Sequence, residues 1–567
     1  MLIEEACMAD QPEVSTEVKE YGNKRIEVIY RKIRSAAESG GRYPELAPGV
    51  TVGDGILIER DVAVPMRDGT IIYTDIYRPD GATDVPAIVP WSPFGKRVSY
   101  LGEGPMPGVP PVSPMTKFEG PDPAYWCKHG YAIINVDARG AGNSEGDILQ
   151  FCTGEGRDAH DLTEWVAAQD WCNGKVGMSG NSWLAISQWF AAAERPPHLA
   201  AIAPWEGIDD MYRDSLCIGG VPEVGFIGMI LHMMCGPNRM EDNGAMILKY
   251  PLMNAYWEDK IARVENIEIP AYVVASYNPL HTHGTFDAYR RMSSRNKWLR
   301  VHNTQEWADY YDPKNIEDLR RFFDHYLKGI ENGWEKTPRV RISVLDPGGT
   351  DQVNRSEKEW PLARTQYQKL YLDASTNALS LEPLKEEVAE HYKADDGKGQ
   401  ATFTITFNED TELTGYMKLR LWVEADGADD MELFVYVSKL DEEGNHLPAF
   451  VLGFPNPGVR GILRVSHREL DETRSTPSEP YLLHRREQLL KPKEIVPVEI
   501  GIWPIGMIWH AGQQLRLVVQ GYASWWMEDK LFPDGPIFRY DVRNKGDHII
   551  HTGGKYDSHL LVPKIPR

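Results

Sequence analysis

The segment DAHDLTEWVAAQDWCNGKVGMSGNSWLA, residues 158–185, predicts a helix, a strand and a second helix in direct succession. Leu162 and Val166 fall on one face of the first helix, and the run KVGM is typical of a buried strand. This strand passes through a glycine and an asparagine to Ser182, and the second helix, WLAISQWF, begins immediately afterwards. A tight strand-to-helix turn with a serine at its tip is the setting of a nucleophile elbow, which lifts the hydroxyl above a sheet.

Short β-rich runs alternate with amphipathic stretches on both sides of this segment, from about Ile56 to Val344. The alternation indicates a doubly wound, mainly parallel sheet with helices on both faces. About sixty residues separate the strands expected at Ile202 and Tyr272, which is too long for a loop in a compact domain. We therefore expect a helical cap inserted at about 208–266. Roughly the first forty residues are interpreted as a polar helical extension.

After Leu345 the pattern changes to period-two alternation, as in ATFTITF, YMKLRLWVEAD and QQLRLVVQG, and turns such as DEEGN and FPNPG separate several of the runs. Few helical windows occur, so this part is predicted to be an all-β sandwich of jelly-roll type. The expected organisation is an α/β domain over residues 1–345 followed by a β-sandwich over residues 346–567.

The composition argues against several classes of protein. A formal net charge of -22 argues against nucleic-acid binding, because a phosphate backbone requires a basic face. No stretch approaches the ~20 apolar residues that span a bilayer, and the acidic N-terminal residues lack the apolar core of a signal peptide. Widely spaced cysteines without a CxxC pair indicate reduced thiols in a cytoplasmic protein. Gly140-Ala141-Gly142 is followed by Glu145 where a dinucleotide loop needs glycine, and no cofactor is expected.

Ser182 is the predicted nucleophile. The helix behind it offers free backbone N–H groups and the positive end of a dipole, which suit a developing oxyanion. The backbone N–H of Trp183 is therefore the expected oxyanion donor. The strict G-x-S-x-G pattern is not met, because Leu184 and Ala185 follow Trp183. Ser179 is a rival one step inside the strand, and a plain turn with a capping serine is the non-catalytic alternative.

Four further segments carry a resemblance to a known family: VPMRDGTIIYTDIYRPDG at 64–81, DARGAGNSEGD at 137–147, FFDHYLKG at 322–329, and HAGQQLRLVVQG near the C-terminus. Together with the elbow segment they resemble, in order, the cocaine esterase and X-Pro dipeptidyl-peptidase family of serine hydrolases. The resemblance covers most of the chain and implies an α/β-hydrolase domain followed by a jelly roll. It also implies catalysis by a serine, a histidine and an acid, with a tyrosine hydroxyl as an oxyanion donor.

The chain departs from the family at three of these positions. The family acid, in a Trp-Tyr-Asp context, falls within SYNPLHTHG here, where Asn278 or Pro279 stands in its place. The family histidine, in a Gly-Pro-Trp-Ser-His context, falls within HNTQEW, where Glu306 stands in its place. The family tyrosine, in a Pro-Tyr-Asp-Lys loop, is Phe94 in this sequence.

Two hypotheses follow from these departures. In the first, base and acid have exchanged loops: His281, or His283 two residues later, is the base, and Glu306 orients it. If that stretch is extended, the two imidazoles point to opposite sides and only one faces Ser182. In the second, hydrolysis has been lost, and the pocket binds a ligand or performs a lyase or cyclisation step. A metal held through His281-x-His283 lacks a third ligand at suitable spacing, so no metal is expected.

Aromatic residues on the loops around the elbow indicate that the substrate carries an apolar group. Trp91, Phe94 and Trp307 are expected to ring the pocket, although the same rings can equally be packing. The indole N–H of Trp91 or the hydroxyl of Ser92 could replace the missing tyrosine as oxyanion donor. The leading hypothesis is a serine-dependent hydrolase of an ester or amide with a bulky, largely apolar group. The expected binding partner of such a hydrolase is a small-molecule substrate. Neither a nucleic acid nor a membrane is expected as a partner, and a homo-oligomer is possible.

Overall fold

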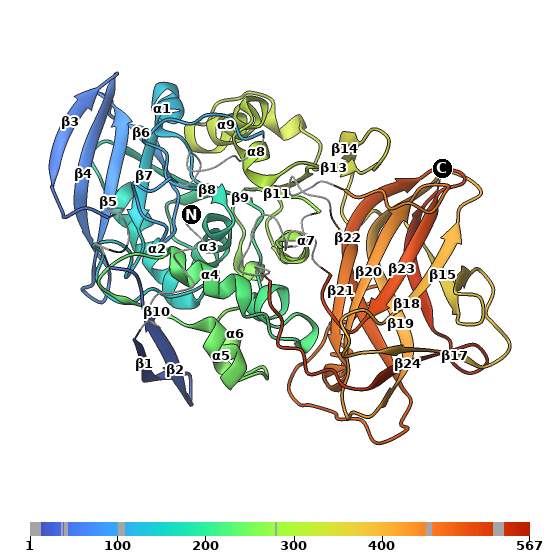
Figure 1. Cartoon of the computed structure of the whole chain (residues 1–567). Coiled ribbons are helices and arrows are strands. Elements are labelled where there is room, and N and C mark those ends of the chain that lie inside the picture. The colour runs from blue at the N-terminus through green and yellow to red at the C-terminus, as the bar shows by residue number, and fades with distance from the viewer. Residues whose placement is uncertain are drawn as a thin grey trace.

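The computed structural model describes residues 13–35, 38, 43–99, 108–277, 280–449, 456, 458–524 and 538–566. Two bodies lie side by side in Figure 1, each built around one large sheet. The first body, coloured blue to yellow, carries the long helices, and the second, coloured orange to red, consists mainly of strands. This arrangement agrees with the change of pattern that the sequence has near Leu345.

The first body contains an 11-stranded sheet in the order β14-β13-β12-β11-β9-β8-β6-β7-β5-β4-β3. All neighbouring strands from β13 to β7 in this order are parallel, and the strands beyond them at both edges are antiparallel. The strands are β3 Gly49–Gly53, β4 Ile56–Pro65, β5 Ile71–Pro79, β6 Val85–Val89, β7 Ala132–Asp137, β8 Cys172–Asn181, β9 Leu199–Trp205, β11 Ala271–Ala275, β12 Lys297–Val301, β13 Val340–Val344 and β14 Gln352–Glu357. Because β14 still pairs with β13, this sheet continues past the predicted boundary at residue 345.

Helices cover both faces of this sheet, because successive side chains of each central strand point to opposite cores. In β6, Ala87 and Val89 belong to the core under helices α2 and α3, whereas Ile88 belongs to the core under α1 and α9. The helices of this layer arrangement are α1 Pro123–Trp126, α2 Thr153–Ala167, α3 Trp183–Ala193, α7 Thr282–Arg291, α8 Glu306–Tyr310 and α9 Pro313–Lys328. The predicted doubly wound α/β fold is confirmed.

The insert predicted at about 208–266 is mainly helical. Its elements are η3 Tyr212–Leu216, η4 Ile218–Gly220, α4 Gly225–Met233, β10 Arg239–Glu241, α5 Asn243–Lys249, α6 Ala255–Glu258 and η5 Val264–Asn266. The short strand β10 does not join the large sheet and pairs instead with a strand near the N-terminus.

The prediction of a helical N-terminal extension is wrong for the described residues. They form a hairpin, β1 Val14–Tyr21 and β2 Lys24–Lys32, and β10 adds a third strand to it. Val28 and Tyr30 are fully buried while their neighbours in β2 are not, which is a period of two and therefore the signature of a strand. The many charged residues of this segment obscured that alternation.

The second body is an 11-stranded β structure in the order β17-β24-β19-β25-β15-β16-β18-β23-β20-β21, with β22 paired to β19. The predicted jelly-roll class is confirmed. The strands are β15 Gln366–Asp373, β16 Ala378–Ser380, β17 Val388–Lys393, β18 Gln400–Thr406, β19 Thr411–Asp426, β20 Glu432–Leu440, β21 Val459–Arg464, β22 Val496–Trp509, β23 Gln514–Gln520, β24 Asp547–Thr552 and β25 His559–Ile565. Strand β22 binds the end of the first body, because Leu345 N donates to Gly506 O at 2.8 Å.

Two further expectations concern cysteines and membranes. Five cysteines are free thiols, and Cys7 lies outside the described residues; the five are Cys127, Cys152, Cys172, Cys217 and Cys235. Across the described ranges, no helix combines the length and the apolar character needed to cross a bilayer.

Candidate active site

Ser182 lies on a strained turn between β8 and α3. Its φ of 53° and ψ of -116° place this residue in a region that side chains other than glycine rarely adopt. Gly180 makes the turn possible, because an added Cβ there would lie 2.4 Å from Leu184 Cβ. Asn181 and Trp183 are buried, whereas Ser182 keeps part of its surface exposed. The turn therefore presents the hydroxyl as a nucleophile elbow does.

His281 lies beside this hydroxyl. Its Nε2 is 3.3 Å from Ser182 Oγ, which is within the looser range expected of an empty site. The residue follows β11 and occupies the cap position of α7, so the carboxyl end of a parallel strand delivers it. Its side chain is nearly fully buried, at 6% exposure for the whole residue. The structure thus brings the predicted nucleophile and the predicted base together.

Two carboxylates face the other nitrogen of the same imidazole. Glu306 Oε2 lies 3.3 Å from His281 Nδ1, and Glu206 Oε2 lies 3.7 Å from it. Glu306 begins α8 after β12, and Glu206 directly follows β9. Because β9, β11 and β12 are neighbouring parallel strands, their carboxyl ends bring these three side chains to one edge of the sheet.

Glu206 and His302 are site residues that the sequence interpretation missed. Glu206 is fully buried at a φ of 56°, and its Oε1 lies 2.6 Å from Nε2 of the buried His302. His302 comes immediately after β12. The available signal was that each residue directly follows a buried parallel strand, in APWEG and WLRVHN.

Burial by itself lowers the pKa of His281, but hydrogen bonding and charge from Glu206 and Glu306 outweigh it and raise the pKa from 6.5 to about 10. Burial likewise raises the pKa of Glu206, yet the charges and hydrogen bonds of His302 and His281 overcome it and bring the pKa to about 2. The imidazole of His281 is therefore held as a cation between two carboxylates at neutral pH.

His283, the alternative base, is directed elsewhere. Its Nδ1 lies 2.6 Å from Asp214 Oδ1, and its ring stacks on Trp503 of the second body at 6.1 Å between centroids. The stretch is not extended, which was the condition under which the two imidazoles were expected on opposite sides. It is the first turn of α7, where Thr285 N donates to His281 O, so the two imidazoles diverge around the helix. Asn278 and Pro279, which replace the family acid, lie outside the described residues.

Ser179, the rival serine, is fully buried and lies 3.0 Å from Tyr310 OH through its Oγ. It belongs to β8 itself, where its side chain points into the core that α8 covers. This position gives a substrate no access to its hydroxyl.

Comparisons with known proteins agree with this geometry. A family model described as X-Pro dipeptidyl-peptidase (S15 family) matches residues 68–305, and one for the X-Pro dipeptidyl-peptidase C-terminal non-catalytic domain matches residues 332–561. Cocaine esterase from Rhodococcus sp. is 24% identical, with coverage of 90% of this chain and 99% of that protein. A solved CocE/NonD family hydrolase from Staphylococcus aureus is 34% identical, covers 92% of this chain and 97% of its own, and has a TM-score of 0.87. This chain belongs to the CocE/NonD hydrolase family.

The chain is therefore an enzyme of the hydrolase type, as the sequence predicted. An α-amino acid ester hydrolase that is 18% identical shares the fold over 91% of this chain and 98% of its own, with a TM-score of 0.68. Membership of the CocE/NonD family makes the arrangement around Ser182 the candidate active site of this enzyme.

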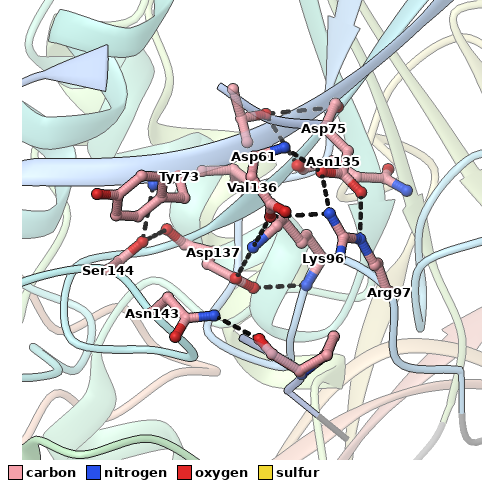
Figure 2. A network of polar contacts seen from close by, with 12 residues as sticks. Asp61, Tyr73, Asp75, Lys96, Arg97, Asn135, Val136, Asp137, Asn143 and Ser144 are labelled. Atoms are coloured by element: carbon pink, nitrogen blue, oxygen red, sulfur yellow. Dashed lines mark hydrogen bonds and ion pairs between the residues drawn. The ribbon is translucent and has the colours of Figure 1, made fainter. Parts of the chain in front are cut away.

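The loop after β6 reaches the elbow, where Phe94 contacts the ring of Trp183, and buried polar contacts hold this loop in place. Lys117 Nζ donates to Ser92 O at 2.9 Å, and Lys96 Nζ lies 2.6 Å from Asp137 Oδ2. Figure 2 shows Lys96 and Arg97 surrounded by Asp61, Asp75 and Asp137. A loop fixed in this way can keep a hydrogen-bond donor in position without reorganisation.

Of the three aromatic residues predicted to ring the pocket, the structure contradicts Trp91. It is fully buried, and its Nε1 donates to Glu155 Oε1 at 3.1 Å, so it neither faces a substrate nor offers an oxyanion donor. The sequence could not indicate that the indole N–H of Trp91 donates to a buried carboxyl group, that of Glu155. The Oγ of Ser92 is also fully buried and has no hydrogen-bond partner among the described residues.

Phe94 and Trp307 belong to a chain of aromatic rings that reaches the elbow. Phe94 packs edge-on against Trp183 at 5.7 Å and against Phe118 at 5.2 Å between centroids. Phe118 in turn contacts Trp307 at 5.5 Å. Phe94 is 5% exposed, whereas Trp307 keeps part of its surface exposed. Both remain predicted substrate contacts, Trp307 with the more open surface.

The backbone N–H of Trp183 is the predicted oxyanion donor. Trp183 is the first residue of α3, and the first N–H groups of a helix have no partner within it. The side chain of Ser182 does not cap these groups. A developing negative charge on a carbonyl attacked by Ser182 would therefore meet an N–H group at the positive end of a helix dipole.

Glu119 is a third carboxyl group of the site and was also missed. It is 3% exposed, its Oε1 accepts from Trp307 Nε1 at 3.0 Å, and its backbone carbonyl accepts from Asn181 N at 3.1 Å. Burial, followed by the charge of Glu306, raises its pKa well above 4.5. Burial and the negative charge of Glu306 therefore both favour the protonated form of Glu119.

Glu119→Gln should therefore change activity by no more than a few-fold, because an amide has nearly the shape and charge of a protonated carboxyl. The matched variant Glu306→Gln should lower kcat by about 10²- to 10⁴-fold, since it removes a charge that faces His281. Parallel kcat measurements on a p-nitrophenyl ester compare the two. An equal loss in both variants would mean that Glu119 acts as an ionised group.

The same cluster contains the atoms that a metal would use. Within the described ranges, donor atoms of Glu206, His281 and Glu306 all lie within 4.8 Å of one another, so this set has one nitrogen and two oxygen ligands. The group differs from the His281-x-His283 pair considered from the sequence. A cation on Nδ1 would take the place of the proton held there and would leave Nε2 protonated, which is incompatible with a base toward Ser182.

Proposed function

We propose that this CocE/NonD hydrolase cleaves a carboxylic ester or amide that carries a bulky, largely apolar group. The observation that carries the proposal is the line from Ser182 Oγ to His281 Nε2 and from His281 Nδ1 to Glu306, with separations of 3.3 and 3.3 Å. A serine hydroxyl followed by an imidazole and a carboxylate is the arrangement that activates a serine for acyl transfer.

In this proposal, Ser182 Oγ attacks the carbonyl carbon of the substrate while neutral His281 takes its proton. The carbonyl oxygen becomes negative and accepts a hydrogen bond from the N–H of Trp183. His281 then gives its proton to the leaving alcohol or amine as the carbon–oxygen or carbon–nitrogen bond breaks. Water, deprotonated by the same imidazole, hydrolyses the acyl-enzyme and returns Ser182 to its starting state.

Glu306 is the proposed orienting acid, and Glu206 the secondary one. Glu306 is nearer to His281 Nδ1, at 3.3 Å against 3.7 Å. Glu206 also contacts a second imidazole, that of His302, whose pKa is raised by the charges of Asp309 and Glu206 although burial alone would lower it. Glu206 is thus shared between two imidazoles, which leaves Glu306 with the larger part of the orienting role.

The pH dependence follows from the raised pKa of His281. A base must be neutral, and a group with a pKa of about 10 is mostly protonated at pH 7, so kcat/KM should increase about tenfold per pH unit from neutral pH toward that value. Glu306→Gln should move the profile to lower pH, because the raising charge is removed. Normalised rates of ester hydrolysis between pH 6 and 10 test both. A plateau above about pH 7.5 in both enzymes would contradict the account.

A panel of p-nitrophenyl esters tests the substrate class. Esters with branched or aromatic acyl groups should exceed the acetate ester in kcat/KM by about ten- to a hundredfold, as apolar contact with Phe94 and Trp307 would provide. Phe94→Ala should reduce this preference while it leaves the acetate rate within a few-fold. Equal rates across the panel would contradict an apolar acyl pocket.

The alternative function is a non-hydrolytic reaction in the same pocket, such as an elimination or cyclisation. The two carboxylates that face His281 favour it, because they raise the pKa of the imidazole to about 10, and an imidazolium is a general acid from the start. Such an enzyme would not form an acyl-enzyme on Ser182. Turnover of a p-nitrophenyl ester that is lost in Ser182→Ala separates the two, because only the hydrolytic route passes through an acyl-enzyme on Ser182.

A further inference from the structure

Glu155 is a buried carboxylate under the elbow that the catalytic scheme does not use. It lies in the first turn of α2 and is 3% exposed. Its Oε1 accepts from Trp183 Nε1 at 2.8 Å and from Trp91 Nε1 at 3.1 Å, and its Oε2 accepts from Phe151 N at 2.8 Å. One oxygen atom therefore joins two tryptophans that are far apart in the sequence.

These two tryptophans belong to the two segments that surround the expected oxyanion position. Trp183 carries the backbone N–H donor at the start of α3, and Trp91 begins the loop that continues to Ser92 and Phe94. The same segments meet again where Ser187 Oγ donates to Trp91 O at 3.1 Å. The direction of the donor depends on how the loop and the helix are fixed to each other.

Helix packing leaves Glu155 little freedom to move. The adjacent Gly156 lies against α3 so closely that an added Cβ would be 2.7 Å from Phe190 O. The backbone at Glu155 therefore packs closely against α3, the helix that begins at Trp183. The three hydrogen bonds that Glu155 accepts fix the position of both carboxyl oxygens. A carboxylate held in this way can act as a rigid link between two elements.

We propose that Glu155 is a positioning residue for oxyanion stabilisation, because it fixes the Trp183 backbone and the Trp91 loop against each other through their indole N–H groups. This inference rests on the proposed function, since it assumes a tetrahedral intermediate on Ser182. Glu155 touches neither substrate nor reacting atoms. Its effect reaches the reaction through the direction of the Trp183 N–H, so it should influence the transition state and not the bound substrate.

Two variants separate this role from simple filling of space. Glu155→Leu is similar in volume but leaves both indole N–H groups without an acceptor. Glu155→Gln retains one carbonyl oxygen for the two indoles and changes only the atom that faces Phe151 N. We expect kcat to fall about ten- to a hundredfold in the leucine variant, with KM changed less than about threefold, because small displacements of a catalytic group carry effects of this size. The glutamine variant should recover most of kcat.

A matched control is Glu223→Leu. Glu223 is also buried, at 2% exposure, and accepts three backbone N–H bonds, from Gly225, Phe226 and Arg539. Its replacement should lower the unfolding temperature as Glu155→Leu does, but leave kcat within about twofold. The comparison shows whether a loss of kcat follows from reduced stability or from the link at the elbow.

The decisive experiment measures inhibition by an aryl boronic acid, which forms a tetrahedral adduct on a serine, together with kcat and KM for a p-nitrophenyl ester. The inference is supported if the boronate inhibition constant of Glu155→Leu rises by the same factor by which its kcat falls. Both quantities should return toward wild-type values in Glu155→Gln. Unchanged boronate inhibition in a folded variant, or a parallel loss in Glu223→Leu, overturns it. A wild-type enzyme without turnover or boronate inhibition overturns the proposed function, and this inference with it. If the leucine variant does not fold, Trp91→Phe replaces it, because it removes one of the two indole N–H groups that Glu155 accepts. We expect kcat and boronate inhibition to weaken together in this variant, and wild-type values of both would contradict the link.

Discussion

Ser182→Ala should lower kcat for a p-nitrophenyl ester by about 10⁴- to 10⁶-fold while the fold is retained, because the variant has no atom that can form the acyl-enzyme. The side chain lies at the tip of the turn and caps no helix N–H group, so its removal should change the unfolding temperature little. Steady-state kinetics and a thermal unfolding curve measure the two effects.

The matched control for this variant is Ser179→Ala, three residues earlier in β8. Ser179 loses only the contact with Tyr310 OH, so kcat should stay within a few-fold of wild type. If Ser179→Ala abolished turnover and Ser182→Ala did not, the elbow would be wrongly placed. If both retained turnover, hydrolysis would not proceed through a serine of this strand.

His281→Ala should produce a loss of similar size, about 10⁴- to 10⁶-fold in kcat, because serine is a poor nucleophile without a neighbouring base. The double variant with Ser182→Ala should be no slower than either single variant, since residues that act as one unit are not additive. The control is His283→Ala, whose imidazole contacts Asp214 and Trp503 instead, and which should change kcat only a few-fold. A larger loss in His283→Ala than in His281→Ala would reverse the assignment of the base.

The sequence was sufficient for the fold because its signals were local and repeated. The strand and helix around residues 158–185, and the period-two runs after Leu345, each predict the same arrangement as their neighbours. The N-terminal hairpin was not predicted, because its alternation is carried by few apolar residues such as Val28 and Tyr30 among many charges. The edge strand β14 was missed for a related reason, since most of its residues are exposed.

The candidate site was predicted only in part, because its geometry depends on which strand ends meet. Ser182, His281 and Glu306 were predicted from the sequence, and the structure places the imidazole of His281 3.3 Å from Ser182 Oγ and 3.3 Å from Glu306 Oε2. Glu206 follows a different strand, and no local pattern indicates that it faces His281 together with Glu306. Trp91 looked like a pocket residue because its loop position was known, but its burial and its bond to Glu155 depend on tertiary contacts. Composition cannot reveal such contacts.

The central claim is that Ser182 is an activated nucleophile, and labelling with a fluorophosphonate probe tests it most directly. The probe reacts with a serine whose hydroxyl is deprotonated by a neighbouring base, and digestion followed by mass spectrometry identifies the labelled peptide. We expect one adduct on Ser182, faster labelling as the pH rises toward 10, and no adduct in His281→Ala. An unlabelled wild-type protein at alkaline pH, or an adduct on Ser179, would contradict it.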